Sequence, residues 1–265
     1  MLIAQISDSH NVEPGRKTCD VAPTSERLAE LVTCVNKLDP LPDVALITGD
    51  ITHDGTDAQA EQAKHLLAPL KMPYHVVPGN HDDRTALAKV FSGQACPSQD
   101  AEFLHYVIED YDTRLIGLDS TNPASPGGEF CQRRADWLEA RLSELSEKPT
   151  ILFMHHPPVK FGVLETDVDG FEGSDLLGEL VERFLNIERV LCGHIHLTAH
   201  THWRGTIVST APSAGGMRLA LDLTLKKSSG FHLVNPEFQL HYRTSNGGLV
   251  THQVEVSEND NLYLF

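Results

Sequence analysis

Short apolar runs alternate with longer amphipathic segments over the first three-quarters of the chain. Leu28, Leu31, Val32 and Val35 stand at i, i+3, i+4 and i+7, the spacing of one helix face. Runs such as DVALIT are typical of buried strands. The pattern predicts strands at 2–7, 43–48, 74–77, 103–108, 114–118, 150–154 and 189–192, and helices at 25–38, 57–70, 133–145 and 176–184. This alternation predicts an α/β fold in which helices cover layered sheets.

The pattern changes after residue 205, where the predicted strands follow one another without helices between them. These strands fall at 206–209, 218–223, 231–234, 238–242 and 250–256. We expect residues 1–265 to form a single domain. Within it, we expect the strand-rich part 206–265 to complete a second sheet, to form a lid or to make a dimer contact. Long polar loops at 11–23, 122–130 and 159–173 are candidates for setting specificity.

Residues of metal-ligand type stand directly after five of the predicted strands. They form the motifs Asp8-Ser9-His10, Gly49-Asp50, Gly79-Asn80-His81-Asp82, His155-His156-Pro157-Pro158 and Gly193-His194-Ile195-His196. Because ligands bind beyond the carboxyl ends of strands in open α/β sheets, the five motifs are expected to meet at one pocket. A turn or a loop cap explains most of these motifs singly, but not all five in this order.

The backbone at these motifs is expected to bring ligands together. In an extended chain, residues i and i+2 point to the same side, so Asp8 with His10, and His194 with His196, should face the pocket as pairs. The glycines of three motifs lack a side chain, which lets the backbone turn sharply and approach an ion closely.

These motifs resemble the pattern of the calcineurin-like metallophosphoesterases, which is D-x-H, G-D, G-N-H-D/E, H and G-H-x-H. The resemblance runs from residue 8 to residue 196, and the forms GNHD and HHPP are similar to class III cyclic nucleotide phosphodiesterases and bacterial glycerophosphodiesterases. It implies a four-layer αββα sandwich with two mixed sheets and two metal ions at the strand ends. It also implies that one ion is held by Asp8, His10, Asp50 and His196, and the other by Asp50, Asn80, His155 and His194.

The resemblance further implies that Asp50, Asn80 and His81 act in catalysis. Asn80 and His81 would bind the substrate, with His81 contacting the phosphate or the leaving oxygen. His53 lies three residues after Asp50 and is either a substrate contact or an exposed loop residue. We assign His156 to hydrogen bonding or packing, and expect Asp82 to orient His81 or to cap the helix that follows.

Charge narrows the choice of partner. The chain has 37 acidic and 21 basic side chains, a net charge of −16. Such a surface repels nucleic acid and anionic lipid, so we expect a small anionic substrate that binds where cations gather. The seven proposed ligands carry two negative charges, which leaves two divalent ions enough positive charge for a hydroxide and a phosphodiester. Nitrogen and oxygen donors without thiolate favour divalent or trivalent Mn, Fe, Zn or Co.

These features predict a metal-dependent hydrolase of a small phosphodiester, either a 3′,5′-cyclic nucleotide such as cAMP or a glycerophosphodiester. A hydroxide bridging the two ions would attack the phosphorus. The alternatives are a phosphomonoesterase acting on nucleotides or phosphoproteins, and a non-catalytic scaffold of the same fold. Five dispersed cysteines and the lack of a long apolar run predict a cytoplasmic protein without a membrane partner. The resemblance and the strand-rich C-terminal part favour a homodimer or a higher homo-oligomer.

Overall fold

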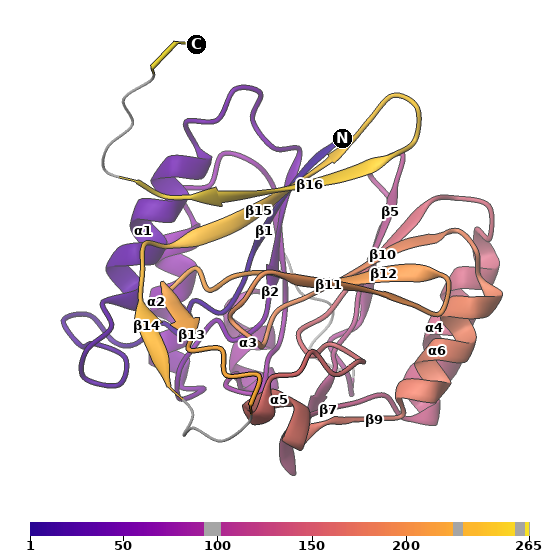
Figure 1. Cartoon of the computed structure of the whole chain (residues 1–265), viewed down its shortest axis with the longest axis horizontal. Coiled ribbons are helices and arrows are strands. Elements are labelled where there is room, and N and C mark those ends of the chain that lie inside the picture. The colour runs from indigo at the N-terminus through magenta and orange to yellow at the C-terminus, as the bar shows by residue number, and fades with distance from the viewer. Residues whose placement is uncertain (93–101, 225–229, 258–262, 265) are drawn as a thin grey trace.

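Two β-sheets lie face to face in the computed structural model, and helices cover the outer side of each sheet (Figure 1). The structure describes residues 1–92, 102–224, 230–257 and 263–264. Helices α1 (Thr24–Val35), α2 (Asp57–Leu67) and α3 (Arg84–Val90) pack on the first sheet, and α4 (Gln132–Glu144) and α6 (Ser174–Arg183) on the second. This arrangement confirms the predicted α/β fold with two mixed sheets. Within the described ranges, no helix combines the length and the apolarity needed to cross a membrane.

The first sheet has five strands in the order β16-β15-β1-β2-β3. Strands β1 (Leu2–Ile6), β2 (Val44–Thr48) and β3 (Tyr74–Val77) are parallel, whereas β15 (Glu237–Arg243) and β16 (Leu249–Glu255) are antiparallel to their neighbours. The C-terminal part of the chain therefore extends the sheet that the N-terminus begins.

The second sheet has six strands in the order β11-β12-β10-β8-β5-β4. The four inner strands are parallel: β12 (Thr206–Thr210), β10 (Ile187–Cys192), β8 (Thr150–Phe153) and β5 (Arg114–Gly117). The edge strands β11 (Ala199–Trp203) and β4 (Tyr106–Ile108) run antiparallel. Smaller elements surround the strand ends: β6 (Thr121–Asn122), β7 (Ser125–Glu129), α5 (Leu164–Asp169), β9 (Phe171–Glu172), β13 (Met217–Leu219) and β14 (Phe231–Leu233).

Strand β2 shows why the apolar runs in the sequence are unbroken. Val44 and Leu46 point into the layer between the sheets, whereas Ala45 and Ile47 point toward the helices of the first sheet. Both faces of the strand are buried, so neither set of alternating positions is polar.

The structure corrects several predicted boundaries. Helix α2 ends at Leu67 rather than at residue 70, because Pro69 has no backbone N–H to donate to the carbonyl four residues before it. The strands after residue 205 belong to three different sheets. Strand β12 joins the second sheet, β15 and β16 join the first, and β13 and β14 form a separate antiparallel pair. The loops expected at 122–130 and 159–173 contain β7, α5 and β9, which are too short to be recognised by periodicity.

Candidate metal centre

The five motifs lie together at the carboxyl ends of the strands and are joined by hydrogen bonds. The backbone N–H of Asp8 donates to the Gly49 carbonyl at 3.1 Å, and that of His194 donates to Asp8 Oδ1 at 3.0 Å. The Gly193 N–H donates to the carbonyl of His155 at 2.9 Å. Strands β1, β2, β8 and β10, from both sheets, thus meet at one place.

The backbone at these positions is left-handed rather than extended. Positive φ angles occur at Asp8 (54°), His10 (44°), Asp50 (48°), His194 (73°) and His196 (53°). This conformation is unfavourable for non-glycine residues and persists only where surrounding contacts enforce it, typically at functional sites. The expectation that extended backbone aligns residues i and i+2 is therefore wrong. Tight turns aim these side chains instead.

Four predicted ligands form the first cluster: Asp8, His10, Asp50 and His196, whose ligand atoms lie within 4.8 Å of one another. His10 Nε2 lies 3.5 Å from Asp50 Oδ2, and His196 Nε2 lies 3.5 Å from Asp8 Oδ1. The Nε2 atoms of the two histidines are 3.0 Å apart. Donor atoms from three motifs therefore point at one small volume, as a metal ion requires.

The second cluster adjoins the first through Asp50. His155 Nε2 lies 3.3 Å from Asp50 Oδ2, and the ring nitrogens of His155, His156 and His194 cluster within 4.8 Å. Asn80 Oδ1 and His155 Nε2 are buried and have no hydrogen-bond partner in the described part of the chain. Buried polar atoms are normally satisfied, so these two fit the ligands of an ion. The donor set of the two clusters suits two transition metals sharing one aspartate.

Backbone carbonyls fix which ring nitrogen faces each cluster. His155 Nδ1 lies 2.8 Å from the Thr48 carbonyl oxygen, and His196 Nδ1 lies 2.6 Å from that of Met217. A carbonyl oxygen only accepts, so each Nδ1–H donates and each Nε2 lone pair is left for an ion. Sequence reasoning missed Thr48 and Met217, because every residue has a carbonyl and its use leaves no sequence signal.

The charges of the clusters favour a cation. Burial lowers the pKa of His10 well below its usual range and that of His194 to about 3, so both rings are neutral. Burial raises the pKa of Asp8. Burial would also lower the pKa of His155, but the adjacent Asp50 carboxylate raises it to about 9. The space between His155 and Asp50 therefore attracts positive charge, which a proton or a metal ion can supply.

The calcineurin-like phosphoesterase family matches residues 1–197. The chain belongs to this family. The match includes all the predicted ligands, so the family resemblance deduced from the five motifs is confirmed, and with it the expectation of a phosphoesterase.

Two relatives of this phosphoesterase are named as phosphodiesterases. A probable glycerophosphodiester phosphodiesterase of Arcobacter nitrofigilis is 34% identical over 266 residues, covering 100% of this chain and 97% of that relative. A probable cyclic nucleotide phosphodiesterase of Rhodopseudomonas palustris is 31% identical over 77% of this chain and 75% of that relative. The crystal structure of a dimetal phosphatase from Danio rerio, 14% identical, has the same fold with a TM-score of 0.64 and covers 97% of this chain and 99% of that one.

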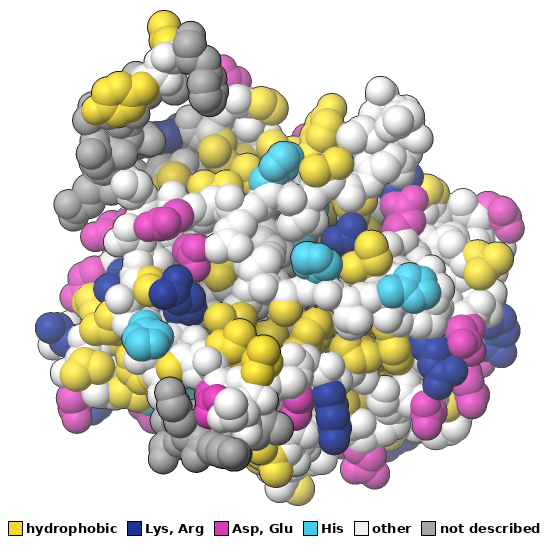
Figure 2. Space-filling view, viewed as in Figure 1, with side chains coloured by type: hydrophobic (Ala, Val, Ile, Leu, Met, Phe, Trp, Pro, Cys, Tyr) yellow, Lys and Arg dark blue, Asp and Glu magenta, His cyan; other side chains and the backbone are white. Residues whose placement is uncertain are grey.

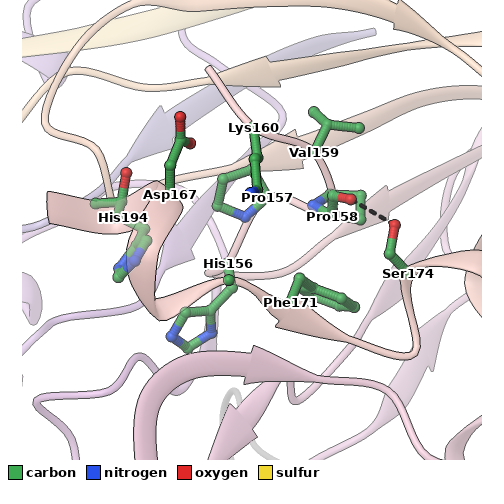
Figure 3. Close-up of a pocket in the computed structure, with 11 residues that line it drawn as sticks. His156, Pro157, Pro158, Val159, Lys160, Asp167, Phe171, Ser174 and His194 are labelled. Atoms are coloured by element: carbon green, nitrogen blue, oxygen red, sulfur yellow. Dashed lines mark hydrogen bonds between the residues drawn. The ribbon is translucent and has the colours of Figure 1, made fainter. Parts of the chain in front are cut away.

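In the described part of the chain, three pockets open beside the two clusters of the phosphoesterase. The apolar pocket, of about 360 Å³, extends from the predicted ligands His10, Asp50, Asn80, His194 and His196 to a wall of Met217, Leu219 and Phe231. The polar pocket, of about 790 Å³, extends from Asn80 and His81 to Arg84 and the 121–126 segment. The small pocket, of about 220 Å³, has His194 at one side and Ser174, which donates to the Pro158 carbonyl, at the other (Figure 3). All three predicted specificity loops contribute to these walls.

His81 lies where the apolar and polar pockets meet. Its backbone N–H donates to Asp50 Oδ1 at 2.9 Å, and its Nδ1 lies 2.7 Å from the His53 carbonyl oxygen. The His53 ring stacks on the His81 ring with centroids 5.3 Å apart and lines the apolar pocket. Both histidines are thus within the site.

Asp82 performs neither of the roles expected for it. Its carboxylate accepts hydrogen bonds from the backbone N–H groups of Ile51, Thr52 and Gly79 at 2.8–3.1 Å. These bonds join the loop after β2 to the loop after β3. The neighbouring Asp83 caps α3 instead, by accepting the Ala86 N–H.

Both ring nitrogens of His156 have hydrogen-bond partners. Nδ1 pairs with Ser120 Oγ at 2.9 Å, and Nε2 donates to the Pro126 carbonyl at 3.1 Å. This geometry agrees with a hydrogen-bonding role and leaves no lone pair aimed at the second cluster.

Proposed function

We propose that the chain is a metal-dependent phosphodiesterase acting on a small acyclic phosphodiester such as a glycerophosphodiester. A 3′,5′-cyclic nucleotide such as cAMP is the second candidate. One observation carries the proposal: donor atoms from four loops, those at 8–10, 50, 155–156 and 194–196, converge in two clusters joined through Asp50. The phosphodiesterase names of two relatives support it.

In this proposal the chain itself supplies the complete ligand set. One ion is held by Asp8, His10, Asp50 and His196, and the other by Asp50, Asn80, His155 and His194. Their nitrogen and oxygen donors favour Mn, Fe, Zn or Co. Two such ions, when bound, lower the pKa of a water molecule and offset the charge that develops on the phosphate.

Asn80 and His81 have atoms left to act on the substrate. When Asn80 Oδ1 serves an ion, its Nδ2–H₂ group can donate to a phosphate oxygen. His81 Nδ1 is occupied by the His53 carbonyl, which leaves Nε2 for the substrate. In the protonated ring, Nε2–H can pass its proton to the departing alkoxide oxygen, which leaves as an alcohol.

The pockets support a diester rather than a monoester. The apolar and polar pockets both contain Asn80 and His81, so a phosphate held there has room for an alcohol on each side. Among the described residues that line the three pockets, only Arg84 and Lys160 are Lys or Arg, and Arg84 is paired with Asp119. The second negative charge of a monoester would therefore find little compensation.

The same geometry favours an acyclic diester. Both ester oxygens of a 3′,5′-cyclic nucleotide belong to one ribose, which needs a single pocket, whereas an acyclic diester has two separate alcohols. On the face drawn in Figure 2, Lys and Arg lie singly among Asp and Glu, which supports a small substrate over a polyanion.

A substrate panel tests the proposal. The chain loaded with Mn²⁺ should hydrolyse bis(p-nitrophenyl) phosphate at least about tenfold faster, in kcat/KM, than p-nitrophenyl phosphate. Glycerophosphoethanolamine should be hydrolysed faster than cAMP. Faster hydrolysis of the monoester would favour a phosphomonoesterase. Failure to retain two transition metals per chain in elemental analysis would favour a scaffold.

A further inference from the structure

The side-chain amide of Gln5 joins the two sheets next to the metal centre. Gln5 of β1 is fully buried. Its Nε2 donates to Thr48 Oγ1 at 3.0 Å and to the Cys192 carbonyl at 2.9 Å. Thr48 ends β2 in the first sheet, and Cys192 ends β10 in the second. Asp50 and His194 follow two residues later, so one amide connects the two strand ends that lead to them.

The other end of this amide reaches the C-terminal strands. The Cys192 carbonyl can only accept, so Gln5 presents its nitrogen there and its oxygen to His241. His241 Nε2 therefore donates to Gln5 Oε1 at 3.0 Å. Nδ1 then accepts from the hydroxyl of Thr251 at 2.8 Å. Burial lowers the pKa of His241 to about 3, which agrees with a neutral ring that has one donor and one acceptor.

We propose that Gln5 and His241 are positioning residues, which couple strands β15 and β16 to the strand ends holding Asp50 and His194. His241 and Thr251 lie beyond residue 197, where the family match ends. The C-terminal strands would then help to set the affinity of the metal centre, although they contribute no ligand. The inference rests on the metal centre of the proposed function.

The ligand loops need such support because their backbone is strained. Asp50 and His194 have left-handed φ angles and lie two residues beyond the atoms that Gln5 binds. The Thr48 carbonyl also accepts from His155 Nδ1 and from Ser7 Oγ, so a shift of Thr48 would move a third ligand. Partners that orient metal ligands typically change metal affinity about 10- to 100-fold when they are removed.

Gln239 provides a matched control. It is the cross-strand neighbour of Gln5 and is 1% exposed. Its Nε2 donates to the Thr210 carbonyl at 3.0 Å and to Thr198 Oγ1 at 3.2 Å, and so reaches neither β2 nor β10. Removing either amide leaves buried acceptors unpaired, but only Gln5 binds the strands that lead to Asp50 and His194.

The test measures metal dissociation constants by competition with a chelating dye, together with the melting temperature. Gln5→Met should weaken binding of the more weakly held Mn²⁺ at least about tenfold. Gln239→Met should change the Mn²⁺ dissociation constant less than about twofold, although it lowers the melting temperature by a similar amount. His241→Phe should reproduce the Gln5→Met effect, whereas His241→Gln, which keeps an N–H for Gln5, should restore most of the affinity. The two His241 variants still test the inference if Gln5→Met does not fold.

The outcomes separate this inference from the proposed function. Gln5→Met or His241→Phe could lower the melting temperature and yet bind Mn²⁺ with wild-type affinity. This result would show that the amide only contributes to packing, and it would overturn the inference. Equal losses in Gln5→Met and Gln239→Met would do the same. A wild-type chain that binds no ions would instead overturn the metal centre, and the inference with it.

Discussion

The loops that carry the proposed ligands (the ligand loops, at 8–10, 49–50, 79–82, 155–158 and 193–196) and the pocket walls around them are built differently. Asp8 and His155 are completely buried, and their loops are joined by hydrogen bonds between the two sheets. The walls come from short elements such as α5 and β14, where Asp169 is exposed and Phe231 is half-buried. The difference suggests that the reaction depends on the rigid loops and the choice of substrate on the walls. Four predictions test this division, from the largest expected effect to the smallest.

Asp50→Asn should abolish the reaction while leaving the fold intact. The carboxylate faces both clusters, so replacing it with a neutral amide of the same shape weakens both proposed ion sites at once. We expect turnover to fall by more than about a thousandfold, measured as kcat on the Mn²⁺-loaded chain. Asp112→Asn, in the exposed turn between β4 and β5, is the control and should leave kcat unchanged. Retention of two ions by Asp50→Asn would contradict the shared-aspartate arrangement.

The ligand loops could be predicted from sequence because their chemistry needs particular side chains. Carboxylate, imidazole and amide groups are the available ligands, and glycine is needed where a side chain would collide: a Cβ on Gly79 would lie 2.2 Å from Asp50 Oδ1. The left-handed backbone of Asp8 could not be predicted, since it results from contacts between loops distant in the sequence. The same applies to the carbonyl partner of His196 on Met217.

His81→Gln should slow the reaction in a way that depends on the leaving group. Loss of the proton donor matters most for a poorly leaving alkoxide, so we expect a loss of about a hundredfold in kcat for a glycerophosphodiester and less than about tenfold for bis(p-nitrophenyl) phosphate. His53→Gln, at the stacked neighbour, is the control for disturbed packing. Equal losses on both substrates would remove the proton-donor role and leave His81 as a phosphate contact.

Removing the ions should affect the ligand loops and spare the walls. Ions bound well above their dissociation constants stabilise the folded state by about 4 kcal/mol, so chelation should lower the melting temperature by roughly 10 °C. Hydrogen exchange should increase at residues 8–10 and 193–196, which hold proposed ligands. It should stay unchanged in β7 and α5. Faster exchange in β7 or α5 on chelation would show that walls and loops respond as one unit.

The pocket walls gave a weaker sequence signal, because an apolar residue in a short strand is indistinguishable from a core residue. The strand at 231–234 was predicted as β structure, yet nothing in its sequence places Phe231 beside a metal centre. Its position follows from the pairing of β14 with β13, whose Met217 carbonyl binds His196.

Phe231→Ala should give the smallest effect and alter binding rather than the reaction itself. The side chain lines the apolar pocket beside Met217 and Leu219. Losing about 40 Å² of apolar contact costs roughly 1 kcal/mol, so KM should rise about fivefold for a diester with a bulky apolar alcohol. Since this contact is equally strong in the ground and transition states, kcat should stay nearly constant. Leu233→Ala, on the same strand but 45% exposed and outside the pocket lining, is the control. A large fall in kcat for Phe231→Ala would show that the walls help to position the reacting phosphate, and the division between loops and walls would no longer hold.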